Sequence, residues 1–227
     1  MKTYKIYLIR HGLTKENSIG KYIGSTDVPL SAEGKAKLED FRTRFEYPKA
    51  GLVYTSPLSR CTQTADVLYP SLPKIISPGL SECNFGTWEG KTVDELKGNS
   101  EFIKWMTGEN VELTNGGESI KDFTSRVSNT FEKIIDEIIR IYKKDVIIVT
   151  HGGVIMTILS KYGIPKANPY DWIANNGCGY SIRITPSLWM REQVFEVYEK
   201  IPAQKEDKLE EESMYIMDIL KNSLKGS

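Results

Sequence analysis

Histidine is scarce in this chain, and so is cysteine, the other side chain that most often binds zinc. Two histidines and three cysteines occur in 227 residues. Cys61, Cys83 and Cys178 have no spacing typical of a metal site. An odd number of cysteines without a secretory leader also indicates a reducing compartment. We therefore predict a protein without a metal and without any other cofactor.

An excess of charge of one sign and a long apolar run are also missing. Thirty basic and thirty acidic side chains cancel to a formal net charge of zero, which argues against a nucleic-acid surface or a polybasic membrane anchor. No stretch approaches the ~20 apolar residues of a membrane helix, and the N-terminus does not resemble a signal peptide. We expect a soluble cytoplasmic protein with no nucleic-acid or membrane partner, in which any anion binding is local.

The size and composition predict one globular unit with a tail. Hydrophobic residues make up 40% and charged residues 26% of the chain, as in ordinary globular domains. We assign residues 1–203 to one domain with a lid-like excursion at about 79–117, and residues 204–227 to a C-terminal helical tail. The tail has apolar residues at helical spacing: Leu209, Ile216, Leu220 and Leu224. This tail either docks on the domain or serves a partner, so the protein is expected to be a monomer or a homodimer.

Each histidine begins a glycine-containing turn directly after a run of β-branched and apolar residues. Residues 6–10 precede His11, and residues 146–150 precede His151. Such runs, bounded by glycine and followed by a helical pattern, are typical of strands in a parallel sheet covered on both faces. Ligands of such sheets gather at the strand C-termini. We therefore expect His11 and His151 to face each other across one site, although two separate structural histidines are the alternative.

Further helix and strand signals follow the first histidine. Residues 12–30 are too polar and too rich in turn residues for a helix, and predict a loop. Ser31 can then cap a helix, and residues 52–55 predict a second short strand. Ser56 and Pro57 suit the N-cap and the first position of the next helix.

The second half of the chain predicts an excursion and then a return to the sheet. Residues 70–117 have weak periodicity and are expected outside the main sheet. Ser119 begins a long amphipathic pattern that runs to Tyr142 and predicts a helix covering the sheet. A further helix follows the second histidine. Strands predicted at 180–185 and 194–200 are expected to run antiparallel.

Five polar or charged side chains fall at or near the predicted strand ends: Arg10, His11, Arg60, Glu82 and His151. A phosphoryl group in transit spreads negative charge over three oxygens, so its catalysis depends on positioning and electrostatic complementarity. Arg10 and Arg60 provide planar, permanently charged donor forks that match phosphate oxygens. The set therefore suits phosphoryl transfer.

The chemistry of these side chains suggests a separate catalytic role for each of them. A neutral imidazole can attack phosphorus, and two neighbouring guanidinium groups keep His11 neutral near pH 7. His151, protonated or donating a hydrogen bond, would stabilise the transferring group. Glu82 could protonate the leaving alkoxide and later deprotonate water, although a surface charge is the alternative interpretation. Asn17 and the amides near Gly12 are either neutral donors or ordinary turn residues.

Several blocks of the sequence resemble the histidine phosphatase superfamily, the phosphoglycerate-mutase-like group. They are residues 10–12 with Thr14 and Asn17, residues 22–30, residues 55–60 with Gln63 and Thr64, residues 80–90, and residues 150–153. They occur in the right order and the resemblance spans roughly residues 4–200. It implies an α/β fold, a three-layer α/β/α sandwich with a mostly parallel central sheet, and a metal-free phosphate site.

The resemblance also implies roles for individual residues. The catalytic pair is His11 as nucleophile and Glu82 as acid and base. The phosphate-binding residues are Arg10, Asn17, Arg60 and His151. Additional candidate substrate contacts are Gly24, Ser25 and Gly152.

A lack of arginine between Arg60 and Arg126 favours a hydrolase over a mutase. Mutases of this superfamily hold a substrate with a carboxylate and a second phosphate, which calls for further cationic forks, and lysines are weaker bidentate partners. The stretch after Glu82 also resembles the phosphatase branch, which includes alpha-ribazole phosphatases and broad-specificity phosphatases. The aromatic side chains of that stretch suit a lid over a ring-bearing leaving group or a small satellite core.

We therefore expect a histidine acid-type phosphatase, a phosphoric monoester hydrolase. It would act on a small organic phosphate through a phosphohistidine intermediate, with alpha-ribazole phosphate as one candidate substrate. A cofactor-dependent phosphoglycerate mutase is the alternative within the superfamily. A catalytically silent phosphatase-like binding protein is the alternative of a different class, and only the tail helix favours it.

Overall fold

The computed structural model describes residues 2–107, 109 and 115–202, so the predicted tail helix at 204–227 lies outside the described residues. The strands are β1 (Tyr4–Arg10), β2 (Val53–Thr55), β3 (Lys74–Ile76), β4 (Asp145–Thr150), β5 (Gly163–Ile164), β6 (Gly179–Ile184) and β7 (Phe195–Ile201). The α-helices are α1 (Lys15–Ser18), α2 (Ala32–Arg44), α3 (Ser59–Leu68), α4 (Val93–Leu96), α5 (Ser100–Met106), α6 (Ile120–Arg140), α7 (Gly152–Tyr162) and α8 (Pro186–Glu192). Short 3-10 helices are η1 (Pro78–Leu80), η2 (Gly86–Trp88) and η3 (Pro169–Trp172).

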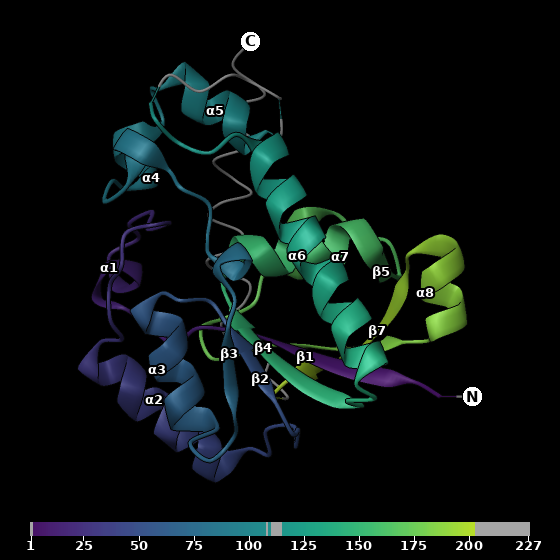
Figure 1. The fold of residues 1–227 in the computed structure, drawn as a ribbon. Helices are drawn as coiled ribbons and strands as arrows, with labels where there is room; N and C mark the ends of the chain where they lie inside the picture. Colours follow the sequence, from purple (N-terminus) through teal and green to yellow (C-terminus); the bar gives the residue numbers. More distant parts are fainter. Residues whose placement is uncertain (1, 108, 110–114, 203–227) are drawn as a thin grey trace.

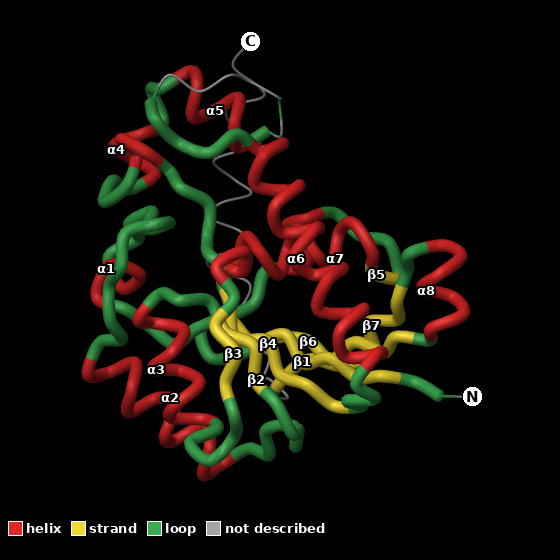
Figure 2. Tube along the Cα trace, in the orientation of Figure 1, coloured by secondary structure: helices red, strands yellow, loops and turns green. Residues whose placement is uncertain are grey.

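The strands form one mixed sheet in the order β3-β2-β4-β1-β6-β7-β5 (Figure 2). Strands β3, β2, β4 and β1 pair in parallel, and β5 pairs in parallel with β7. Strand β6 runs antiparallel to both of its neighbours, β1 and β7. The sheet is therefore mostly parallel, as predicted, and the expected antiparallel pairing of the last two strands is confirmed.

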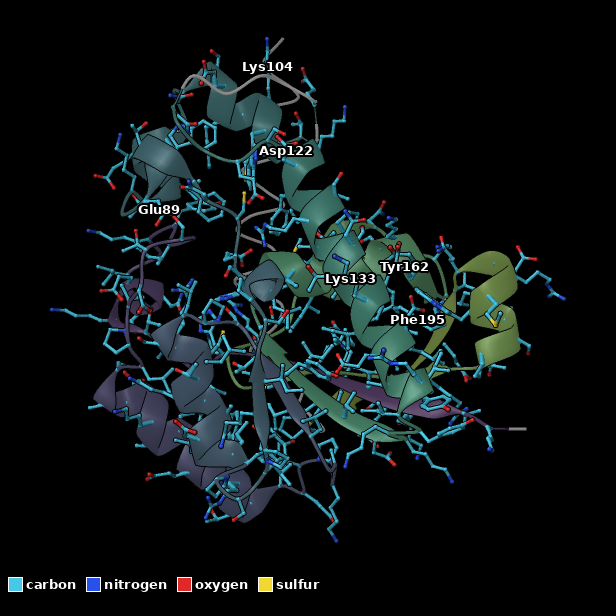
Figure 3. All side chains as sticks on the ribbon, viewed as in Figure 1. Glu89, Lys104, Asp122, Lys133, Tyr162 and Phe195 are labelled. Carbon is cyan, nitrogen blue, oxygen red and sulfur yellow. The ribbon has the colours of Figure 1, made fainter. Side chains whose placement is uncertain are left out.

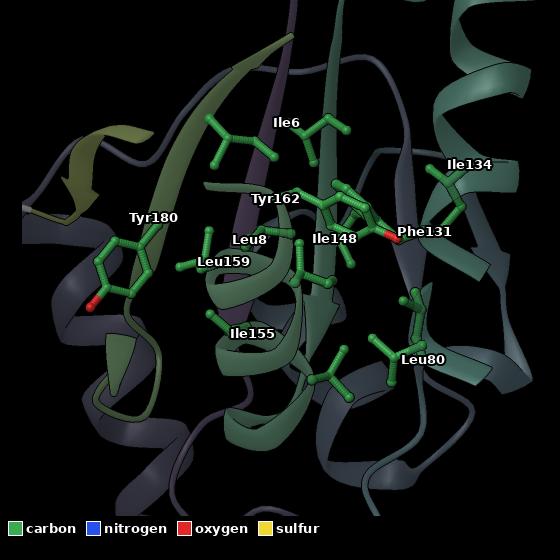
Figure 4. Close-up of a cluster of buried hydrophobic side chains, with 14 of the residues drawn as sticks. Ile6, Leu8, Leu80, Phe131, Ile134, Ile148, Ile155, Leu159, Tyr162 and Tyr180 are labelled. Atoms are coloured by element: carbon green, nitrogen blue, oxygen red, sulfur yellow. The ribbon is translucent and has the colours of Figure 1, made fainter. Parts of the chain in front are cut away.

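Alternating side chains of the central strands separate two apolar layers. Ile6 and Leu8 of β1 join a core cluster with α6 and α7, whereas Tyr7 and Ile9 join a second cluster with α2 and α3. Successive strand residues point to opposite faces of a sheet, which explains this division. Figure 4 shows the first cluster, and Figure 1 shows the two helix pairs on opposite faces of the sheet. The predicted three-layer α/β/α sandwich is thus the observed fold.

Two helix boundaries near the first and second strands differ from the sequence prediction. The loop at 12–30 contains the short helix α1, because Thr14 and Asn17 form a reciprocal capping box. Helix α3 begins at Ser59, three residues after the predicted N-cap Ser56, and its N-cap Leu58 makes no side-chain capping bond. The Ser56 hydroxyl instead lies 2.8 Å from His151 Nε2.

The excursion is also shorter than residues 70–117, because residues 74–76 form the edge strand β3. Helices α4 and α5 stand beyond the sheet edge at which the parallel strands end (Figure 1). The predicted helical stripe to Tyr142 ends early, since α6 stops at Arg140 and Tyr142 has φ of 56° and is 69% exposed. No helix within residues 2–107, 109 and 115–202 is long and apolar enough to cross a membrane.

The aromatic residues of the excursion form an extension of the core. Trp88 packs edge-on against Phe102, with ring centroids 5.4 Å apart, and both are almost fully buried at 2% and 3% exposure. Trp105 packs against Phe85 with centroids 5.3 Å apart and remains half-buried. Of the two interpretations, the small core therefore applies to Trp88 and Phe102.

Candidate active site

The two histidines lie side by side because β1 and β4 are adjacent parallel strands in register. Arg10 pairs with Thr150, and the backbone N–H of His11 donates to the Thr150 carbonyl at 2.9 Å. The imidazole centroids of His11 and His151 are 5.2 Å apart, with 61° between the ring planes. Exposure is 5% for His11 and 0% for His151. The expectation that both histidines leave the sheet at one edge and face each other is confirmed.

Hydrogen bonding determines which nitrogen of His11 is available for chemistry. Nδ1 lies 2.7 Å from the Gly12 carbonyl oxygen, and a carbonyl only accepts, so Nδ1 carries the proton and Nε2 keeps its lone pair. The turn is held by Thr64, whose hydroxyl accepts from the Gly12 N–H at 2.8 Å and donates to the Arg60 carbonyl at 2.6 Å. His11 is therefore oriented as a nucleophile would need to be.

Burial, followed by the charges of Arg10 and Arg60, holds the pKa of His11 well below the ordinary 6.5. The pKa of His151 is lowered in the same way, by burial first and then by His11 and the two arginines. Arg60 Nε donates to His151 Nδ1 at 3.3 Å, so Nε2 carries the proton and donates to Ser56. His151 is thus a neutral hydrogen-bond donor, and the protonated form considered from the sequence is disfavoured.

These lowered pKa values predict that neither imidazole titrates near the ordinary histidine value. Each group is neutral above its pKa, so a depressed pKa keeps both rings neutral when the pH falls from about 8 to about 6.5. Imidazole resonances in an NMR titration should show no midpoint near 6.5. The variant His151→Asn assigns the His11 signals, and the chain unfolded in urea provides the normal titration for reference. A His11 midpoint at or above the ordinary value would contradict the prediction.

The two arginines approach the histidines from different elements. Arg60 is only 1% exposed, and its guanidinium donates to the carbonyls of Thr26 at 2.9 Å and Gly24 at 2.6 Å in addition to His151. A guanidinium has five N–H donors, and these bonds within the described residues use three of them. Arg10 at the end of β1 donates to the Ala174 carbonyl at 2.8 Å.

Glu82 reaches the N-terminus of α7, beside His151. Its two carboxyl oxygens accept from the backbone N–H groups of Gly153 and Cys83, each at 3.0 Å. The Thr150 hydroxyl donates to the Leu80 carbonyl at 2.7 Å, which ties the segment before Glu82 to the end of β4. Burial raises the pKa of Glu82 despite the opposing N–H groups and arginines. A raised pKa suits a carboxyl group that must donate a proton.

We expect Gly153→Ala to displace Glu82 and to slow turnover of substrates with poor leaving groups. A Cβ at residue 153 would lie 2.6 Å from Glu82 Oε1, closer than such atoms approach. The neighbouring Gly152→Ala is the matched comparison, since its Cβ would lie 3.6 Å from Arg10 Nε, an ordinary contact. Kinetics with an alkyl phosphate should show a loss of about tenfold or more for Gly153→Ala, and a smaller loss for Gly152→Ala. Equal losses of turnover in the two variants would contradict the explanation that Gly153→Ala acts by displacing Glu82.

The remaining residues predicted to contact phosphate or substrate lie around the two histidines. Asn17 Oδ1 accepts from the Thr14 N–H at 3.3 Å and from Asn176 Nδ2 at 3.4 Å, so its amide lies at the start of α1 near the His11 turn. Gly24 is buried, and a Cβ there would lie only 1.7 Å from the Cys83 carbonyl oxygen, so glycine is required. Ser25 is exposed. Their roles as substrate contacts, and that of Gly152 beside Arg10, remain predictions.

Sequence reasoning missed three residues that support the site, of which Asn176 and Ser56 contact the histidine turns directly. Asn176 Nδ2 donates to the carbonyls of His11 at 3.0 Å and Gly12 at 3.3 Å. Its position before a glycine is typical of an ordinary turn, so no sequence signal marked it. Ser56 was assigned to a helix cap, although it accepts the hydrogen bond of His151.

Arg126 was also missed, because it looks like one polar residue on a long amphipathic helix. It forms a bidentate pair with Glu118 at 2.9 and 2.7 Å. Its guanidinium also donates to the carbonyls of Gly79, Ser81 and Glu82 at 3.0, 2.9 and 3.3 Å. Arg126, which belongs to α6, therefore holds the backbone around Glu82 against this helix.

Comparison with known proteins agrees with this geometry. Residues 6–196 match the histidine phosphatase superfamily (branch 1). The chain belongs to this superfamily. It is 27% identical over 185 residues to the adenosylcobalamin/alpha-ribazole phosphatase of Escherichia coli (strain K12), covering 79% of this chain and 90% of that protein. It is 28% identical over 162 residues to a 2,3-bisphosphoglycerate-dependent phosphoglycerate mutase 2 of Gloeobacter violaceus, covering 68% and 73%.

The fold of this histidine phosphatase is shared with solved structures. The alpha-ribazole phosphatase from Shigella flexneri superposes with a TM-score of 0.71 at 24% identity, covering 86% of this chain and 94% of that chain. The predicted family, fold class and enzyme type are therefore confirmed: the chain is an enzyme of the histidine phosphatase type. Relatives named as phosphatases and as mutases are both present, so the family alone does not specify the reaction.

Proposed function

We propose that this histidine phosphatase hydrolyses small organic phosphomonoesters through a phosphohistidine intermediate and without a metal ion. The observation that carries the proposal is the neutral His11 ring, whose Nε2 is unprotonated, near the guanidinium groups of Arg10 and the buried Arg60. Arg10 and Arg60 would hold the phosphoryl oxygens, with Asn17 as a neutral donor. His151 would join them by redirecting its Nε2–H from Ser56 to a phosphoryl oxygen. These groups provide fixed positive charge and N–H donors for the charge of the transition state.

The first half-reaction would transfer the phosphoryl group to His11. Nε2 forms the new P–N bond while the P–O bond to the leaving group breaks, and the protonated Glu82 gives its proton to the leaving alkoxide. The raised pKa of Glu82 increases the fraction that carries this proton near neutral pH. The product alcohol then departs, and the Glu82 carboxylate remains.

The second half-reaction would transfer the phosphoryl group to water. The Glu82 carboxylate takes a proton from a water molecule, whose oxygen forms a bond to phosphorus while the P–N bond breaks. Inorganic phosphate leaves, His11 returns to its neutral form, and Glu82 is protonated again. A single carboxyl group therefore serves both steps, and the protons balance over the cycle.

The distribution of arginine supports a hydrolase rather than a mutase. No arginine occurs between Arg60 and Arg126 in the sequence. Arg126 is bound to Glu118 and to backbone carbonyls behind Glu82, so it supplies no fork for a second anionic group of a substrate. The half-buried Trp105 of the excursion, and the half-buried Tyr22 that packs against Phe85 and Phe102 of the same excursion, favour an uncharged, ring-bearing leaving group. Alpha-ribazole phosphate, suggested by the relatives, is the proposed candidate of this kind.

The proposal includes the location of the enzyme, its partners and its oligomeric state. The balanced charge of the sequence supports an enzyme that acts on a small molecule and has no nucleic-acid or membrane partner. The three cysteines, which form no disulfide among the described residues, support a cytoplasmic location. A monomer and a homodimer are both compatible with the described residues. Sedimentation of the purified chain distinguishes the two states.

A panel of phosphomonoesters tests the proposed reaction. Alkyl, aryl and alpha-ribazole phosphates are supplied together with 3-phosphoglycerate plus bisphosphoglycerate, in the presence and absence of a chelator. Release of free phosphate from several esters, unchanged by the chelator, is the expected result, and vanadate should inhibit by imitating pentacoordinate phosphorus. Isomerised phosphoglycerate without free phosphate would identify a mutase, and loss of turnover in the chelator would overturn the metal-free mechanism. No turnover of any ester would favour the binding-protein alternative.

A further inference from the structure

Residues 24–26 form a loop that lies between two oppositely charged side chains. On one side, the carbonyls of Gly24 and Thr26 accept hydrogen bonds from Arg60 at 2.6 and 2.9 Å. On the other side, the backbone N–H groups of Ser25 and Thr26 donate to Glu89 at 2.7 and 3.0 Å. Backbone dipoles of this loop thus point their negative ends at the cation and their positive ends at the anion.

The peptide group between Gly24 and Ser25 makes this connection through one rigid unit. Its carbonyl accepts from Arg60, and its N–H donates to Glu89. Because the peptide bond is planar and cannot rotate freely, the orientation that satisfies Glu89 also determines where the Gly24 carbonyl meets Arg60. Hydrogen bonds in such a series polarise one another. Arg60 in turn donates to His151, so the series continues to the catalytic centre.

Glu89 is engaged by more than the loop. Oε1 also accepts from the Phe85 N–H at 3.2 Å and from the Ser25 hydroxyl at 3.2 Å. Burial alone would raise the pKa of this carboxyl, but the donors outweigh it and the pKa is lowered. Glu89 is therefore an ionised side chain near neutral pH. Figure 3 shows it where the segment before α4 approaches the chain around α1.

The ends of the same loop are attached independently of Glu89. Tyr22 exchanges two backbone hydrogen bonds at 2.8 Å with Lys91 and Gly90. Asp27 accepts from the backbone N–H and the hydroxyl of Ser59 at 2.7 and 2.8 Å. Removing the charge of Glu89 should therefore relax the centre of the loop without detaching it.

We propose that Glu89 is a positioning residue for the phosphate site, which holds the backbone of residues 24–26 so that their carbonyls orient the guanidinium of Arg60. This inference rests on the proposed function, in which Arg60 binds the phosphoryl oxygens. The described residues engage three of the five N–H groups of Arg60, so its affinity for phosphate depends on the direction in which the other two point. Glu89 would act on phosphate binding and not on proton transfer by Glu82.

The test replaces Glu89 with glutamine, which keeps the size but turns one acceptor into an NH₂ donor facing a backbone N–H. Glu95→Gln is the matched control, because Glu95 lies in the same excursion at 79–117 and accepts from Thr92 at the start of α4. With p-nitrophenyl phosphate, Glu89→Gln should raise KM and the inhibition constants of inorganic phosphate and vanadate by roughly tenfold. The Glu95→Gln values should remain close to wild type. The dependence of kcat on leaving-group pKa should remain unchanged in Glu89→Gln.

A double-mutant cycle with Arg60→Lys separates positioning from a general structural effect. Lysine keeps the charge but has three donors on one nitrogen instead of five in a planar fork, so it cannot hold two carbonyls and His151 and also donate to phosphate. If Glu89 acts through Arg60, Glu89→Gln should weaken phosphate binding much less in the Arg60→Lys background than alone. Additive losses, or a leaving-group dependence altered as in Glu82→Gln, would overturn the inference. Unchanged phosphate binding in Arg60→Lys itself would instead refute the proposed role of Arg60. Thermal unfolding confirms that each variant is folded.

Discussion

Replacement of His11 by alanine should reduce phosphate release from p-nitrophenyl phosphate by about 10³-fold or more. The neutral ring holds its Nδ1 proton against the Gly12 carbonyl, which leaves Nε2 as the unprotonated nitrogen next to two arginines. An activated aryl ester needs little help from an acid, so its loss of turnover reports the nucleophile directly. Steady-state release of p-nitrophenol measures the effect.

Chemical trapping provides the complementary measurement for His11. Wild-type protein quenched during turnover of a radiolabelled ester should carry label that is stable in base and released in acid, as expected of a phosphohistidine. His151→Asn is the matched variant, because it removes the only other imidazole and should still become labelled. Label in His11→Ala, or appreciable turnover of the aryl ester by that variant, would exclude His11 as the nucleophile.

The sequence predicted the parts of the fold that depend on local apolar patterns. Strands β1 and β4 and helix α6 have long, regular runs, so they were placed nearly correctly. Strand β3 was missed, because three residues with exposed Ile75 and Ile76 at a sheet edge carry no burial pattern. Helix α1 is stabilised by the single capping box of Thr14 and Asn17, a signal too short to outweigh the turn residues around it.

The sequence was informative about the site wherever residues follow strand ends. His11 and His151 meet because their strands are neighbours in register, which the pattern alone suggested. Ser56, Asn176 and Arg126 could not be predicted in the same way, since each acts through contacts with residues far away along the chain. Such long-range hydrogen bonds leave no periodic or short-range trace. Polar support of a site is therefore harder to predict than its chemically reactive groups.

Depressed and raised pKa values at this site have a common physical origin. Burial disfavours the charged form of every group, so it lowers the pKa of His11 and raises the pKa of Glu82. The nearby arginines act in the same direction on the histidine and against burial on the carboxyl. The outcome is an unprotonated imidazole and a carboxyl with increased proton affinity, the two protonation states that the proposed first half-reaction requires.

Glu82→Gln should separate substrates by their leaving groups. Glutamine can still accept a backbone N–H, but it cannot donate a proton to an alkoxide or take one from water. We expect kcat/KM to fall by about 10² to 10³-fold for alkyl phosphates, and by a much smaller factor for p-nitrophenyl phosphate, whose leaving group is stable as an anion. A plot of log kcat/KM against leaving-group pKa should therefore become steeper in the variant.

The pH dependence distinguishes proton donation from a passive role of the Glu82 charge. The first half-reaction needs the protonated carboxyl, so kcat/KM for alkyl phosphates should decline as the pH rises through the raised pKa of Glu82, and this decline should be absent in Glu82→Gln. Asp122→Asn is the matched control, since this carboxyl accepts from the Ser119 hydroxyl at the start of α6. An equal loss for alkyl and aryl esters, or an unchanged alkaline limb in Glu82→Gln, would show that another group protonates the leaving oxygen.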